Sequence, residues 1–290
     1  MMTHLLQTVA LGKSRETHHK CPNEAAIMTK TIGLISLPGW DDPAVQEITD
    51  ISLDPVNVQT VMLAENVAAN TLDGMASTDE ALSEAAAQLA RNGCDLVACV
   101  GTSLGWAGQP NTNAARLRGR RIAAKAGVPM IMTGTAIIDM LGLLGARRPA
   151  LACTYHPTDW KNAWHHYVFN TGLDVTLAQN FRDAGIVGPA SLPEALRNPS
   201  PELIKKAVVG IAADAPDSDA IVVTGMGART LNQIQALEAA VGMPVLGADT
   251  ALYASLALAA DLHLVEGCLG QITSYLTPVD ISAPKAVETK

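Results

Sequence analysis

Short apolar runs rich in β-branched residues alternate with longer alanine-rich segments along the chain from Thr31 onward. The longer segments, such as 78–92 and 201–213, carry apolar residues at helical spacing. Short strands separated by helices predict a parallel sheet with crossover connections, so we expect an α/β fold. The expected strands are 32–37, 58–64, 96–100, 130–133, 149–154, 175–178, 220–224 and 244–247.

The chain also repeats itself, which predicts two similar α/β units. The segment DLVACVGTS at 95–103 parallels DAIVVTGMG at 219–227, and residues 127–137 parallel 242–252 in the same order. Ligands of parallel sheets bind beyond the carboxyl ends of the strands, so two facing units would enclose one cleft. The expected divisions are a flexible N-terminal arm at 1–30, a first unit at 31–143 plus 250–275, a second unit at 144–249 and a C-terminal tail at 276–290.

The charge and the cysteine content of the chain limit the kinds of molecule that it can be expected to bind. Twenty basic residues against 28 acidic ones give a net charge of −8, and the basic residues form only short runs, as at 118–121 and 147–148. Nucleic acid and anionic membranes are therefore not expected partners. Five cysteines without a C-x-x-C pair indicate neither a disulfide framework nor a zinc knuckle and suit a reducing cytoplasm. We expect a cytoplasmic monomer or small homo-oligomer that acts on a small molecule.

Gly101, Thr102 and Ser103 directly follow a strand that we expect to be buried. Small residues let the backbone approach a ligand, and two hydroxyls with free N–H groups form a compact donor cluster for an anion. Such a cluster would stabilise a carboxylate or an enolate without a buried cation. The alternative is an ordinary strand-to-helix turn with an N-cap.

The matching turn of the second repeat contains Gly225, Met226 and Gly227, again with exposed backbone donors. Two glycines among four residues indicate close backbone approach to a ligand, although a simple tight turn is an equal alternative. Tyr155 and His156 end the first strand of the second unit, where a phenol can bind an anion and an imidazole can exchange protons. Their alternatives are a half-buried packing residue and a solvent-facing histidine.

Several familiar motifs are missing or incomplete. The chain contains no P-loop, no Gly-x-Gly-x-x-Gly opening a helix after the first strand, and no Gly-x-Ser-x-Gly elbow. The pair His165–His166 has no third ligand at a fitting spacing, so we expect no metal there.

Four segments of the chain resemble the aspartate/glutamate racemase superfamily, and within it the arylmalonate decarboxylases and their maleate isomerase relatives. The resemblance covers about residues 31–275. It implies two pseudo-symmetric three-layer α/β units, each with a four-stranded parallel sheet, an active site in the cleft between them, and no metal or organic cofactor. The segments are Thr31–Ile35 with Pro38, Gly101–Leu104 with Asn113–Ala115, Leu144–Tyr155, and Ala213–Asp219 leading into the Gly225 turn.

In the decarboxylases of this superfamily, hydroxyls and backbone amides hold the carboxylate that stays, and so stabilise the enediolate formed when carbon dioxide leaves. By resemblance, Thr102 and Ser103 match two of those hydroxyl positions and Tyr155 matches the third. Pro38 and the amides of Met226 and Gly227 match the surrounding loops.

The chain differs from the superfamily at the two positions of the catalytic cysteines. Racemases and isomerases of the superfamily use one cysteine at each of the two turns, and the decarboxylases keep the second one to protonate the enediolate. Here the two positions are Gly101 and Gly225, so two-thiol racemisation and thiolate addition lack their nucleophile. Decarboxylation needs the donor cluster more than a thiol, and His156, Cys153 or a water would then deliver the proton.

These residues predict a cofactor-independent decarboxylase, a C–C lyase, acting on a small substituted malonate or a related carboxylic acid. Two alternatives stay open. One is a non-thiol isomerase, hydratase or hydrolase of an unsaturated or cyclic acid, with His156, Asp41 or Asp42 as base. The other is a carboxylate-binding protein without activity.

Overall fold

The computed structural model describes residues 29–38, 42–64, 71–188 and 198–276. The first half runs β1 (Lys30–Ser36), α1 (Ala44–Ile51), β2 (Val56–Met62), α2 (Leu72–Ala76), α3 (Asp79–Arg91), β3 (Leu96–Cys99), α4 (Thr102–Trp106), α5 (Thr112–Ala126), β4 (Met130–Met132) and α6 (Thr133–Leu143). The second half runs β5 (Pro149–Ala152), α7 (Thr158–Phe169), β6 (Leu177–Gln179), α8 (Pro201–Asp214), β7 (Ala220–Val223), η2 (Leu231–Gln233), α9 (Ile234–Val241), β8 (Val245–Gly247), α10 (Ala248–Ala260) and η3 (Gly270–Tyr275).

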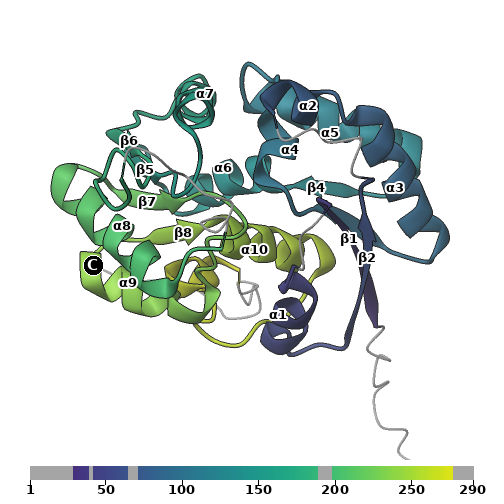
Figure 1. Cartoon of the computed structure of the whole chain (residues 1–290). Coiled ribbons are helices and arrows are strands. Elements are labelled where there is room, and N and C mark those ends of the chain that lie inside the picture. The colour runs from purple at the N-terminus through teal and green to yellow at the C-terminus, as the bar shows by residue number, and fades with distance from the viewer. Residues whose placement is uncertain (1–28, 39–41, 65–70, 189–197, 277–290) are drawn as a thin grey trace, which may run out of the picture.

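The strands form two four-stranded parallel sheets with the same strand order. The first sheet is β2-β1-β3-β4 and the second is β6-β5-β7-β8, so the internal repeat of the sequence corresponds to a repeat of topology (Figure 1). The predicted α/β class and the predicted strands are confirmed, with ends that differ by one or two residues. The edge strand β2 starts earlier than expected because Val56 and Asn57 pair with Lys30 and Thr31 of β1.

The central strands are covered on both faces. Every residue of β3, β5 and β7 is buried, which explains why their sequences read as continuous apolar runs. Among the covering helices, α5 begins where the Asn111 side chain accepts a hydrogen bond from the Ala114 amide, and ends at Gly127 in the left-handed conformation. These signals fix the helix between β3 and β4.

One hydrophobic cluster extends across both sheets, and a second cluster lies against the second sheet alone. A single buried cluster contains residues of the first sheet, such as Leu34 and Val97, together with Leu151 and Val222 of the second. Helix α10 lies between the sheets (Figure 1) and packs against α6, β3, β4 and β8. The carboxyl ends of the strands in the two sheets are therefore held in a fixed relation.

The expected arm at 1–30 and the expected tail at 276–290 lie almost entirely outside the described residues. Within the described part of the chain, no helix combines the length and apolar content that a bilayer crossing requires.

Candidate functional site

The first glycine turn lies beside the loop that follows β1. Gly101 has φ −78° and starts α4, and a Cβ placed on it would lie 3.3 Å from the Cδ1 of Leu37. Pro38 follows Leu37 directly and is half-buried. The structure therefore brings the Pro38 loop and the Gly101 turn together, as parallel neighbouring strands should.

The hydroxyls of this first turn are enclosed. Thr102 and Ser103 are buried, and the Thr102 Oγ1 makes no hydrogen bond within the described part of the chain. A buried hydroxyl without a partner costs about 1–3 kcal/mol, so such groups are commonly satisfied by a ligand or water. This favours a donor site over a plain N-cap, whose side chain would bond to its own helix.

The second glycine turn carries the phenol of Tyr155. Gly225 has φ +99°, and a Cβ placed on it would lie 2.6 Å from the Tyr155 Oη and 2.7 Å from its Cζ. The Gly227 amide donates a hydrogen bond of 3.3 Å to the Tyr155 Oη. The phenol thus occupies the space that a side chain at position 225 would need, and Gly225, Met226 and Gly227 are all buried.

Tyr155 is positioned by a strained neighbour that sequence reasoning missed. Thr154 has φ +42°, which is costly for a β-branched residue and is typical of functional sites. Its Oγ1 donates to the carbonyl of Thr224 at 2.7 Å, and its own carbonyl accepts from the Phe181 amide at 2.7 Å. No sequence signal marks this residue, because threonine has no special preference for the left-handed region.

His156 is buried, so the alternative of a solvent-facing histidine is wrong. Its ring stands edge-on to Tyr155 and beside Trp160, and its Nδ1 has no hydrogen-bond partner in the described residues. The Asn180 side chain donates to the His156 carbonyl at 3.0 Å, which fixes the backbone. Burial lowers the pKa of His156 to about 4, so the ring is neutral at pH 7 and carries no imidazolium proton to give.

This burial predicts a pH-dependent stability. The pKa of about 4 for His156 in the folded protein lies below the value of about 6.5 in an unfolded chain, so folding favours the neutral ring. The stability contribution is complete above about pH 6.5 and falls toward pH 4 by at most about 1.4 kcal/mol per pH unit. Urea unfolding at pH 7, 6, 5 and 4.5 should show a smaller loss for His156→Gln than for the wild type. Equal pH slopes for the two proteins would contradict the assignment.

The thiols near the turns are poor acids. Burial raises the pKa of both Cys99 and Cys153 to about 12, and both side chains are fully buried in the core. Both thiols are core residues, and Cys153 is disfavoured as a proton donor. The four cysteines that the structure describes are all free thiols.

Two carboxylates were candidates for a base. Asp41 lies outside the described residues. Asp42 accepts a hydrogen bond from the Ala44 amide at 2.8 Å, and its Oδ1 lies 3.7 Å from the Arg229 Nη1. Burial raises the pKa of Asp42, partly offset by Arg229. The Asp42 carboxylate therefore caps the backbone amide at which α1 begins.

Aromatic packing joins the two turn regions. Trp106 at the end of α4 lies 5.4 Å from Trp164 and 6.0 Å from Tyr167 of α7, measured between ring centroids. Helix α4 begins at Thr102, and α7 follows shortly after His156. The hydroxyl turn of the first sheet and the tyrosine turn of the second sheet are therefore held by helices in direct contact.

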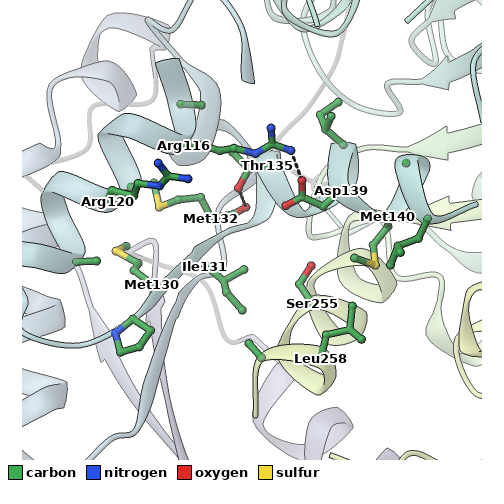
Figure 2. Close-up of a pocket in the computed structure, with 18 residues that line it drawn as sticks. Arg116, Arg120, Met130, Ile131, Met132, Thr135, Asp139, Met140, Ser255 and Leu258 are labelled. Atoms are coloured by element: carbon green, nitrogen blue, oxygen red, sulfur yellow. Dashed lines mark hydrogen bonds and ion pairs between the residues drawn. The ribbon is translucent and has the colours of Figure 1, made fainter. Parts of the chain in front are cut away.

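A groove lies elsewhere on the described part of the chain (Figure 2). It has a volume of about 880 Å³ and is lined by α5, β4, α6 and α10. Arg116 and Asp139, which form an ion pair, are among the residues that line it, and none of the predicted site residues does. In the described residues no group of three or more His, Cys, Asp or Glu side chains is arranged to hold a metal ion, His165 and His166 included.

Comparison with known proteins finds a family model that matches most of the chain. The family model of arylmalonate decarboxylase matches residues 54–271. The arylmalonate decarboxylase of Bordetella bronchiseptica is 30% identical over 181 residues, which are 62% of this chain and 71% of that protein.

Two solved structures show the same fold. A crystal structure of arylmalonate decarboxylase superposes with a TM-score of 0.66 at 24% identity, covering 84% of this chain and 99% of that one. The maleate isomerase Iso from Pseudomonas putida S16 superposes with a TM-score of 0.70 at 19% identity, covering 86% of this chain and all of that one. The predicted superfamily and the predicted fold class, two four-stranded parallel α/β halves, are thereby confirmed.

Proposed function

This chain belongs to the arylmalonate decarboxylase family, and on that premise we propose that it decarboxylates a small substituted malonate without a thiol. In the proposed step the bond between the α-carbon and one carboxylate breaks, and its electron pair enters the carboxylate that stays. Carbon dioxide leaves, and the resulting enediolate takes up one proton at the α-carbon. The substrate therefore becomes a substituted acetic acid.

The buried, unpartnered hydroxyl of Thr102 beside Ser103 is the observation that carries this proposal. Donors fixed in a dry site stabilise developing negative charge without having to reorganise during the reaction. The phenol of Tyr155 and the amide of Met226 supply further donors at the second turn, where the Gly227 amide donates to the phenol oxygen. The absence of a side chain at Gly225 leaves the space that the Tyr155 phenol occupies at this turn.

The proton that the enediolate takes up cannot come from a thiol at either glycine turn. Both turns carry glycine, His156 is neutral at pH 7, and the thiols of Cys99 and Cys153 have pKa values of about 12. We assign the proton to water or a hydroxyl at the site. Loss of a dedicated general acid costs about 10²–10⁴-fold, so we expect a slow decarboxylase.

The test is carbon dioxide release from a panel of aryl- and alkyl-substituted malonates. We expect at least one malonate to be consumed, and Ser103→Ala to lower the rate about 10²-fold, the usual cost of removing one donor to a developing oxyanion. The matched control is Ser83→Ala, a buried serine whose Oγ bonds to the Asp79 carbonyl within α3.

Three results would contradict the proposal. They are a panel left untouched, equal rates for the wild type and Ser103→Ala, and an equal loss in Ser83→Ala. Thermal stabilisation by dicarboxylates with no turnover would instead identify a carboxylate-binding protein. Exchange of an α-proton for deuterium without carbon dioxide loss would identify the isomerase or hydratase alternative.

A further inference from the structure

Arg229 is a half-buried cation in the loop that carries the second glycine turn. Its Nη1 donates to the carbonyl of Met226 at 3.0 Å. That carbonyl and the Gly227 amide belong to the same peptide group, and the Gly227 amide donates to the Tyr155 Oη. The guanidinium therefore holds the carbonyl of the peptide group whose N–H donates to the phenol oxygen.

The same guanidinium is bound from the other half of the molecule. Glu47 lies on α1, which packs against β2 of the first sheet, and its carboxylate forms an ion pair with the Arg229 Nη2 although the two residues are 182 positions apart. Tyr253 of α10 donates to the Glu47 Oε2 at 2.6 Å and accepts a hydrogen bond from Arg229. The ion pair is enclosed, since the side chains of Arg229 and Glu47 are only 16% and 12% exposed.

Further acids surround the pair. Asp249 Oδ2 lies 3.9 Å from the Arg229 Nε and accepts hydrogen bonds from the Thr230 and Leu231 amides, and Asp42 approaches from the loop before α1. Burial by itself would lower the pKa of Arg229, but Asp249, Tyr253 and Glu47 hold it above its ordinary value. The cation is thus permanently charged and fixed from three elements, namely α1, α10 and its own loop.

We infer that Arg229 is a positioning residue that orients the Met226–Gly227 peptide toward Tyr155 and, through Glu47, makes that geometry depend on the docking of α1. A cation at a peptide carbonyl polarises the group and strengthens its N–H as a donor, since linked hydrogen bonds reinforce one another. The inference deepens the proposed function and, for its effect on turnover, rests on it. Arg229 itself touches no reacting atom.

The substrate-free test is amide hydrogen exchange at Gly227 together with the ring resonances of Tyr155, both by NMR. Arg229→Met should raise the Gly227 exchange rate at least about tenfold beyond any global change and shift the Tyr155 signals. Because this variant leaves Glu47 and Asp249 without a counter-charge, Glu47→Gln is the milder second variant, with the same signals moving less. Arg229→Lys should change the Gly227 exchange rate and the Tyr155 signals less than Arg229→Met does. Its ammonium group keeps the positive charge, but it lacks the planar guanidinium that can donate several hydrogen bonds at once.

The matched control is Arg116→Met, which removes the half-exposed ion pair with Asp139 in the groove of Figure 2. It should leave both signals unchanged. The inference would be overturned if the Gly227 and Tyr155 signals stayed unchanged in both Glu47→Gln and Arg229→Met. It would also be overturned if Arg116→Met changed these signals to the same extent.

Turnover separates this inference from the proposed function. If the wild type releases carbon dioxide, Glu47→Gln should lower kcat about tenfold with little change in KM, and an unchanged kcat would overturn the positioning role. If the wild type releases none while the NMR signals move as stated, the proposed function fails and the positioning of Tyr155 by Arg229 stands.

Discussion

Replacing Gly225 with cysteine is expected to lower the free energy of unfolding by about 2–5 kcal/mol rather than to install a working thiol. The backbone at this position has φ +99°, which side chains of L-amino acids adopt at a cost of about 1–2 kcal/mol. The new Cβ would also lie 2.6 Å from the Tyr155 Oη, and overpacking of this kind costs about 1–3 kcal/mol.

The internal repeat supplies a matched control. Gly101 occupies the equivalent turn of the first half with φ −78°, and a Cβ there would meet the ends of the Leu104 and Leu37 side chains, which can move. Gly101→Cys should therefore cost about 1 kcal/mol, the low end for overpacking. Urea unfolding of both variants gives the comparison, and equal losses would contradict the account.

A double variant tests the cause of the larger loss. In a Tyr155→Ala background, Gly225→Cys should cost less than it does in the wild type, because the colliding ring is gone and only the backbone strain stays. A cost that does not depend on Tyr155 would show that the phenol does not occupy this space.

Replacing Arg118 with methionine is expected to cost about 3–5 kcal/mol. The Arg118 side chain is 1% exposed, and its Nη1 donates to the Leu104 carbonyl in α4 at 2.6 Å. Its Nη2 donates to the Thr78 Oγ1 at 3.2 Å, and its Nε pairs with Asp79. The variant leaves a buried carbonyl and a buried hydroxyl without their donor, whereas Asp79 is half-exposed and contributes less because water can solvate it.

The free energy of unfolding is again measured in urea, with Arg118→Lys as the control. This control should lose less stability than Arg118→Met, because lysine keeps the charge but lacks the planar guanidinium and its several donors. A loss below about 1 kcal/mol for Arg118→Met would show that α4, which begins at Thr102, does not depend on this bracing.

Much of the fold follows from local sequence. Strands β3 and β7 are buried on both faces. A strand of this kind can be predicted from a short run of apolar residues between two turns. The two glycine turns are equally visible, because Gly101 and Gly225 occupy matching positions of the repeat where a strand ends. The pairing order within each sheet then follows from right-handed crossover connections.

The details of the site depend on contacts that are remote in sequence. The backbone of His156 is held by a hydrogen bond from the Asn180 side chain, 24 residues further along the chain. The contact between Tyr155 and Gly225 joins two strand ends, and the pair of Arg229 with Glu47 joins two sheets. Such contacts arise from the packing of whole elements, which periodicity does not encode.

The most direct test of the donor cluster is a crystal structure of the protein with a substituted acetic acid, the proposed product. We expect a carboxylate oxygen within about 2.7–3.2 Å of both the Thr102 Oγ1 and the Ser103 Oγ. A carboxylate held instead by Arg116 or Arg120 in the groove of Figure 2, with the two hydroxyls untouched, would contradict the account.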